Sequence, residues 1–227
     1  MIRTLTTALF VATLATPALA QTAPGRWSVG FGAGTDNRSK DISKSGGDPY
    51  GWAEAEWSGS DGRFYAKGGV EGIKSNGSDL EATLGLGVRP QVGGFDLDIS
   101  AVHKWQVDAM PGVDDDAWEF TASASRAIGP AKARLQVQHS PDGFGTTGAW
   151  TWVEARAGWD FSPTVSASAA VGRREQERAA DYTGYNAGVS WAFHRNAALD
   201  VRWYGTDGPA GDPRYADALV AEVSFGF

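Results

Sequence analysis

Charged residues recur at alternate positions in several short segments of this chain, a spacing that would place them on one face of a β-strand. Two interpretations of such a charged face follow from the sequence. The charges either line a polar passage and create a field that orients and filters solutes, or they pair with one another inside a filled interior. The acidic residues predicted to line the interior are Glu54, Glu56, Glu71, Glu81, Asp96, Asp98 and Glu119, and the basic ones are Lys67, Lys132, Arg134, Arg156, Arg174 and Arg202, with Arg89 and Lys104 on the acidic side.

A different chemistry, lipid hydrolysis, would need a serine, a histidine and a polar group that orients the histidine. His139 and Ser140 are adjacent, and His103 lies near the outer end of another predicted strand. Neighbouring residues on a strand point to opposite faces, so His139 could not serve Ser140 directly. We therefore predict that the protein is not an enzyme, and we interpret the histidines as rim residues at a membrane interface.

Signals for cofactors and metal ions are weak. Residues 143–148 match the nucleotide pattern GxGxxG, but they follow no buried parallel strand and open no helix. Three consecutive aspartates at 114–116 lack the ligand spacing of a calcium loop. We predict no catalytic residue, no cofactor and no metal site.

Composition and the first residues restrict location and partners. The chain has 227 residues, a formal net charge of −7 and a pI of about 4.9, which argues against a nucleic-acid surface. It has no cysteine and therefore no disulfide framework. Residues 1–20 combine a basic start, an apolar run and a final Ala-Leu-Ala, so we predict a signal peptide cleaved after Ala20. Residues 21–227 would form a single domain.

Apolar residues in that domain recur at every second position, which indicates β-strands. In residues 79–89, for example, Leu80 and Leu84 fall on one face, and Glu81 and Thr83 fall on the other. Each such segment has roughly the ten-residue length of a tilted strand that crosses a membrane. The twelve predicted strands are residues 26–34, 49–58, 62–73, 79–89, 94–105, 117–128, 131–139, 149–161, 164–174, 182–193, 197–204 and 216–227.

Tight turns alternate with longer polar connections along the chain. Short turns on one side and long loops on the other are typical of an outer-membrane barrel. Residues 36–48 are the best candidate for a loop that folds inward as a constriction. The long connections are 36–48, 106–116, 140–148, 174–181 and 206–214, whereas 75–78 is short and breaks the rule.

A secreted β-sandwich would also alternate apolar and polar residues, so the aromatic residues distinguish the two folds. Here they gather near both strand ends, as bilayer interfaces favour, whereas a sandwich core would hold its largest rings mid-strand. We predict an all-β, antiparallel up-and-down transmembrane barrel of 12 strands. The band at one end comprises Trp27, Trp57, Phe64, Phe95, Trp159, Phe161, Trp191, Phe193, Phe225 and Phe227, and the other comprises Trp105, Trp118, Phe120 and Trp203.

The last seven residues, AEVSFGF, continue the alternation. Val223, Phe225 and Phe227 would face lipid, while Glu222 would face the interior. This segment would close the barrel against the strand that begins near Trp27, so that no sheet edge stays open in hydrocarbon.

Three motifs are distinctive: Ile-Ser followed by Gly-Asp-Pro within residues 42–49, Phe-Tyr-Ala at 64–66, and Ser-Pro-Asp-Gly-Phe-Gly at 140–145. With them, the chain from about Arg26 to Phe227 resembles the TorF family of porin-like proteobacterial outer-membrane barrels. That family tends to carry Arg-Gly where this chain has Lys40 and Asp41. The resemblance implies that Phe225 and Phe227 belong to the signal read by the barrel-assembly machinery.

We predict an outer-membrane porin-like channel of a Gram-negative bacterium, with both termini periplasmic. Small polar solutes or ions would diffuse passively through a narrow, charge-lined lumen. The alternative is a non-conducting small barrel with a structural or surface-binding role. The expected partners are outer-membrane lipid and lipopolysaccharide, the barrel-assembly machinery and small polar solutes, with no nucleic acid.

Overall fold

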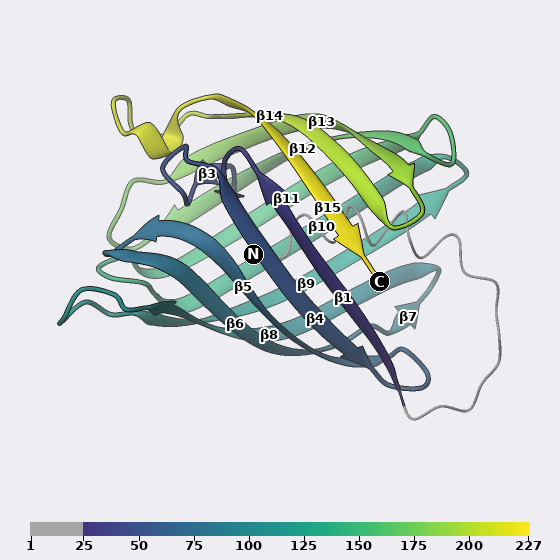
Figure 1. The fold of residues 1–227 in the computed structure, drawn as a ribbon, viewed down its shortest axis with the longest axis horizontal. Helices are drawn as coiled ribbons and strands as arrows, with labels where there is room; N and C mark the ends of the chain where they lie inside the picture. The colour runs from purple at the N-terminus through teal and green to yellow at the C-terminus, as the bar shows by residue number, and fades with distance from the viewer. Residues whose placement is uncertain (1–24) are drawn as a thin grey trace.

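The computed structural model describes residues 25–227. The predicted signal peptide, residues 1–20 with cleavage after Ala20, lies outside the described residues. Twelve long antiparallel strands form one closed sheet (Figure 1), which confirms the predicted fold class. These strands are β1 (Arg26–Gly34), β4 (Tyr50–Ser58), β5 (Phe64–Ser75), β6 (Ser78–Val88), β8 (Phe95–Val107), β9 (Asp116–Ile128), β10 (Ala131–Gly143), β11 (Gly148–Asp160), β12 (Val165–Gln176), β13 (Tyr182–His194), β14 (Ala197–Thr206) and β15 (Ala218–Gly226).

The barrel closes where its first and last strands meet. β1 pairs with β15, and Phe31 lies opposite Phe225 with the two ring centroids 5.3 Å apart. The N–H of Phe227 donates to the carbonyl of Val29 at 2.9 Å, and the reverse hydrogen bond is 3.0 Å. Elsewhere each long strand pairs with its neighbours along the chain, and the short strand β7 (Gln91–Val92) only extends the turn before β8. Closure leaves no edge of the twelve-stranded wall unpaired.

The wall is apolar on its outer face and polar on its inner face, the reverse of a water-soluble fold. Along β6, Leu84 and Leu86 are 60% and 66% exposed, whereas Glu81 on the same strand is fully buried. The same alternation holds around the sheet, so the outer face is apolar and the inner face is polar. Hydrocarbon outside and polar groups inside are the arrangement that a bilayer imposes on a barrel. The two-sheet sandwich therefore does not describe this chain.

The two ends of the barrel differ. At the turn end, on the right in Figure 1, the connections are short; at the loop end, on the left, most are longer. β8, β10 and β12 run further than predicted, to Val107, Gly143 and Gln176, because the backbone groups there find partners on neighbouring strands. The loop-end connections are residues 35–49, 76–77, 108–115, 144–147, 177–181 and 207–217.

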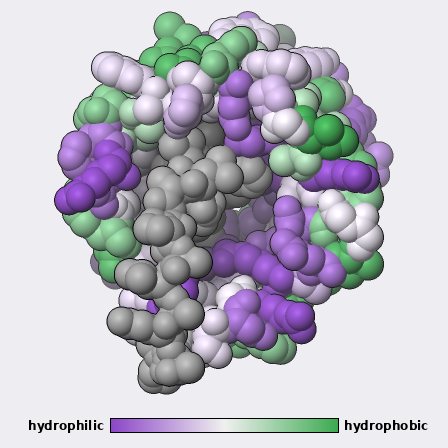
Figure 2. All heavy atoms as spheres, turned by 90° about the vertical axis from the view of Figure 1, so that its right-hand side faces the viewer, coloured by the Kyte–Doolittle hydropathy of each residue, from purple (hydrophilic) through white to green (hydrophobic). Residues whose placement is uncertain are grey.

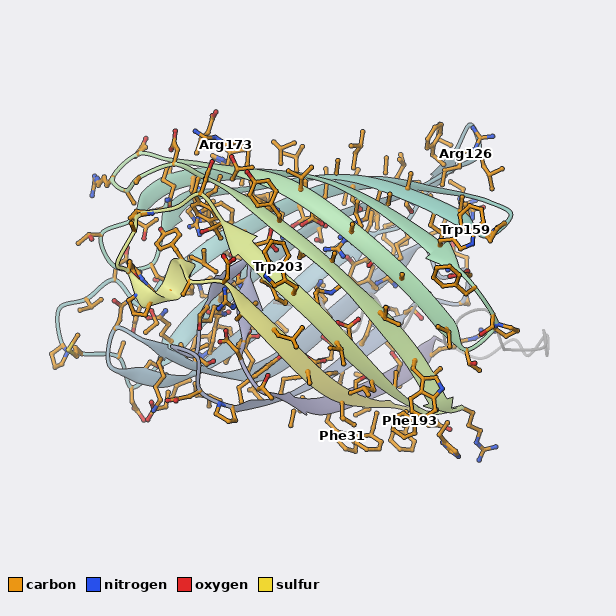
Figure 3. The ribbon with its side chains drawn as sticks, turned by 90° about the horizontal axis from the view of Figure 1, so that it is seen from above. Phe31, Arg126, Trp159, Arg173, Phe193 and Trp203 are labelled. Atoms are coloured by element: carbon orange, nitrogen blue, oxygen red, sulfur yellow. The ribbon has the colours of Figure 1, made fainter. Side chains whose placement is uncertain are left out.

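Most of the predicted aromatic residues project from the outer face. Figure 3 shows Phe31 and Phe193 pointing away from the wall, and Trp203 lies nearer the loop end. Trp27, Trp159 and Phe161, from the band predicted at the turn end, are among the most exposed hydrophobic residues. Within residues 25–227, no helix is both long enough and apolar enough to span a membrane.

Candidate transport lumen

The acidic residues predicted to face the interior divide into two groups along the barrel. Glu71, Glu81 and Glu119 are buried toward the loop end. Nearer the turn end, Glu56 and Asp98 are half-buried, and both contact the guanidinium of one arginine, Arg89. The other two predicted acids are Glu54, which is half-buried, and Asp96, which is exposed and accepts a hydrogen bond from Gln91.

Arg89 forms ion pairs with two of the acidic residues near the turn end. Its two terminal nitrogens donate to both oxygens of Glu56 at 2.6 and 2.7 Å, and its Nε donates to Asp98 at 3.2 Å. The guanidinium lies 3.8 Å from the centre of the Tyr65 ring, and the Tyr65 hydroxyl donates to Asp98 at 2.7 Å. The Lys67 ammonium lies 5.6 Å from the centre of the same ring. This part of the wall is therefore acidic but largely paired.

Most basic residues of the opposite wall are also paired with acids, either on the same strand or on a neighbouring one. Lys132 contacts Asp160 at 2.7 Å, and Arg134 and Arg156 share the buried Glu154 at 3.0 and 3.2 Å. Two further predicted basic residues complete this wall: Arg202, which contacts Asp200 at 3.2 Å and Asn186 at 3.0 Å, and Arg174, whose guanidinium lies 4.6 Å from the Trp150 ring.

Residues 36–45 fold into the barrel at the loop end. They form a small hairpin of β2 (Arg38–Ser39) and β3 (Ile42–Ser43), which we call the inner hairpin (Figure 1). Asp36, Asn37, Arg38, Ser39, Lys40, Asp41, Ser43 and Ser45 are all at most 7% exposed, although they are polar. The predicted inward-folding loop thus lies inside the wall.

Two lysines of the inner hairpin face the acidic wall. Lys44 contacts Glu71, and its Nζ lies 2.8 Å from Glu81. Lys40 reaches Glu119 at 3.3 Å. The wall contributes one lysine of its own, Lys104, whose Nζ lies 3.0 Å from Glu81 and 3.4 Å from Glu119. Three carboxylates and three ammonium groups therefore form one buried network, which we call the lysine–glutamate network.

The other side of the inner hairpin packs against aromatic residues. Trp150, Trp152 and Tyr182 form a buried cluster on the inner face, against which Ile42 and Tyr215 pack. The Tyr182 hydroxyl donates to the carbonyl of Lys40 at 2.7 Å, and the Lys40 ammonium lies 4.1 Å from the Trp150 ring. The sequence analysis did not single out these rings, although the alternation that assigned the inner face also assigns them to it.

The loop of residues 207–217 lies next to the inner hairpin. The carbonyl of Ala216 accepts a hydrogen bond from Arg38 at 2.9 Å, and Tyr215 meets Tyr182 edge to face. Hydrogen bonds from Arg214 lower the pKa of Asp212, the residue that caps the short 3-10 turn of this loop. The loop and the inner hairpin therefore contact each other at this end of the barrel.

The turn end is different. Figure 2 shows it hollowed, with hydrophilic residues around the hollow. Two features of the interior electrostatics follow from the ion pairs. The charge pairs of the wall join residues of the same strand or of nearby strands rather than opposite walls, and the acids near the loop end are paired with lysines of the inner hairpin. A separation of charge between two walls is therefore restricted to the turn-end half.

The residues considered for catalysis do not come together. Ser140 is fully buried, and its hydroxyl donates to the carbonyl of Asp142, whereas His139 lies on the exposed outer face and contacts Thr151 at 3.0 Å. His103 is also on the outer face, 2.6 Å from Asp116. Within the described part of the chain, no three His, Asp or Glu side chains are grouped so that they could hold a metal ion.

Solved outer-membrane channels have similar folds. The KdgM porin aligns with a TM-score of 0.62 at 7% identity, over 88% of this chain and 99% of that chain. The NanC porin aligns with a TM-score of 0.58 at 6% identity, over 89% of this chain and 99% of that chain. The COG4313 outer membrane channel from Pseudomonas putida F1 aligns with a TM-score of 0.56 at 12% identity, over 92% of this chain and 97% of that chain. At these identities the likeness shows the fold alone.

No curated protein sequence matches the chain. Residues 74–223, more than half of its length, match the model of Gcw_chp, a family described as bacterial proteins of unknown function. Membership of the TorF family is not confirmed by these comparisons and stays a prediction.

Proposed function

The chain belongs to the Gcw_chp family, and we propose that it is a narrow outer-membrane channel through which small polar solutes or ions diffuse passively. We further propose that both termini are periplasmic, that the outer band meets lipid and lipopolysaccharide, and that Phe225 and Phe227 take part in recognition by the barrel-assembly machinery. The turn end would then face the periplasm. The TorF resemblance supports the same proposal.

The observation that carries the proposal is the polar hollow at the turn end (Figure 2). A barrel with a purely structural role has no need for an interior of arginine, lysine, glutamate and serine side chains, because apolar side chains would fill it at less cost in desolvation. The hydrophilic wall gives water and dissolved solutes favourable contacts. The similarity to solved porins supports passage across the membrane rather than chemistry at a fixed site.

The pairing of the charges supports small solutes without a large net charge. One similar structure is the KdgM porin in complex with disordered oligogalacturonate, a polyanion. In this chain the basic wall is largely neutralised by Glu154, Asp160 and Asp200. A polyanion would have to compete with these carboxylates for the arginines, so we propose small neutral or weakly charged solutes instead.

The second candidate function is a barrel that does not conduct. The inner hairpin favours it, because the polar side chains of residues 36–45 are almost completely buried at the loop end. In that case the protein would act through its surface or its mechanical role in the envelope. The two candidates make opposite predictions for conductance.

Recording from the refolded mature protein in planar lipid bilayers distinguishes them. We expect discrete conductance steps at high salt that depend on correctly folded protein, with boiled protein as the control. Folding is checked separately by the shift in gel mobility between unheated and heated samples. Folded protein that gives no conductance steps under any applied voltage would contradict the channel function and support the second candidate.

A further inference from the structure

The tip of the inner hairpin has a backbone conformation that its residues resist. Lys40 and Asp41 have φ angles of 51° and 67°, in the left-handed region that glycine and asparagine favour. The two short strands pair through Arg38 with Ser43 and Ser39 with Ile42, and one further backbone hydrogen bond joins Lys44 to Asn37. Two-stranded hairpins are at best marginally stable in water, so contacts with the wall must hold this tip in place.

Those contacts are almost all polar. Asn186 donates to Asp41 Oδ1 at 2.7 Å, Tyr182 donates to the carbonyl of Lys40, and Lys40 pairs with Glu119. Ile42 alone contributes an apolar contact with the aromatic cluster. Water can replace polar partners when such a surface separates, whereas an apolar seal would lose its burial entirely. The docked position is therefore held mainly by polar contacts, which water can replace when the hairpin leaves the wall.

The inner hairpin also carries contacts that hold it together as a unit. Asp36 accepts hydrogen bonds from Arg38 at 2.6 Å, from Ser43 at 2.6 Å and from Ser45 at 2.9 Å. None of these bonds involves the wall, so they can persist when the docking contacts are lost.

A hinge follows the inner hairpin. Gly46 and Gly47 are exposed, both have positive φ angles of 70° and 85°, and an added Cβ at Gly47 would meet no atom within 4 Å. The connection therefore has the backbone freedom and the space to rotate.

We propose that the inner hairpin is a gate: it closes the loop end when docked on the lysine–glutamate network and the aromatic cluster, and it opens the lumen by leaving this position as a unit, anchored at Thr35 on one side and turning at Gly46 and Gly47 on the other. This inference rests on the proposed channel function. The closed loop end then corresponds to one of two positions of the inner hairpin.

A reversible lock tests the gate directly. Asp41 and Asn186 touch, and the chain has no cysteine, so an Asp41→Cys/Asn186→Cys variant can be bridged during refolding, directly or by a short bifunctional thiosulfonate. We expect bridged protein to be closed, with reductant restoring conductance steps. The two single-cysteine variants serve as controls, because each loses the same hydrogen bond but cannot be bridged.

The outcomes separate the gate from the channel. Bridged protein that conducts as the reduced form does would overturn the gate and leave the channel function intact. Folded protein without conductance in either form would overturn the channel function and the gate with it.

A steric variant provides a second test. A Cβ at Gly184 on β13 would stand 2.5 Å from a carboxylate oxygen of Asp41, whereas at Gly158 on β11 it would make only ordinary contacts of 3.4 Å or more. We expect Gly184→Ala to raise the ratio of open to closed time by roughly tenfold, the effect of losing about one buried hydrogen bond. Gly158→Ala should match the wild type. Wild-type gating in Gly184→Ala would count against a docked, movable hairpin.

Discussion

The lysine–glutamate network offers a quantitative test of how much the buried charges stabilise the barrel. Lys104 is 4% exposed, and its ammonium lies between Glu81 and Glu119. Lys104→Met keeps the length of the side chain but removes the charge, which leaves three carboxylates with the two lysines of the inner hairpin. Removing one partner from a buried ion pair costs about 3–5 kcal/mol. Because Glu81 and Glu119 each keep one lysine, we expect a loss near the lower end, about 3 kcal/mol.

A second substitution and a surface control sharpen this test. Lys104→Met combined with Glu81→Gln restores the balance of charge, so we expect a loss of only about 1 kcal/mol. Lys74 pairs with Asp79 at 2.7 Å, but these two side chains are 54% and 77% exposed, so Lys74→Met should leave the free energy of unfolding almost unchanged. Guanidinium unfolding of the protein in lipid vesicles, followed by tryptophan fluorescence, measures all three. Equal losses for Lys104→Met and Lys74→Met, or a double variant less stable than the single one, would refute the reasoning.

Three other perturbations test the lumen, the seam and the inner packing. Arg134→Gln with Arg156→Gln should shift the reversal potential toward cation selectivity, and an unchanged potential would place these arginines outside the conducting path. Deleting Phe227 should slow insertion of the denatured protein into vesicles, because the seam loses two backbone hydrogen bonds; an unaltered rate would contradict a role in assembly. Gly172→Ala should destabilise the barrel by about 1–3 kcal/mol, since the added Cβ would stand 2.0 Å from the Trp152 ring, and wild-type unfolding would show that the ring moves freely.

Matched controls exist for these three variants. Arg173→Gln removes an arginine from the same region, but Arg173 is on the outer face and half exposed (Figure 3), so the reversal potential should stay unchanged. Phe227→Tyr keeps the aromatic ring and both backbone groups and should insert at the normal rate. Gly158→Ala adds the same methyl group to the inner face without a close contact.

The wall of the barrel could be predicted because its signal is local. A residue two positions along a strand returns to the same face, and hydrocarbon on one side with water on the other gives the two faces opposite compositions. Leu84 and Leu86 thus lie outside and Glu81 lies inside, as the alternation indicates. The exact ends of β8, β10 and β12 could not be predicted, because ladder pairing beyond the membrane depends on the neighbouring strand rather than on hydrophobicity.

The candidate site was predictable only as a set of inward positions. Whether Arg134 meets Glu154 depends on the register between β10 and β11, and alternation carries no information about register beyond its parity. The inner hairpin is harder still, because its sequence is polar and has no hydrophobic period. Its partners are remote: Asn186 lies 145 residues beyond Asp41, and Glu119 lies 79 residues beyond Lys40. No local rule places them together.

The charges of the acidic wall and of the inner hairpin are complementary. Without the inner hairpin, the wall residues Glu71, Glu81, Glu119 and Lys104 would together carry a net charge of two negative units within a narrow space. The two hairpin lysines supply that missing positive charge. A hairpin without them would leave uncompensated buried carboxylates, and a wall without the glutamates would leave buried ammonium groups. In the proposed gate, the closed loop end keeps both sets of charges paired, and the open one places both sets in water.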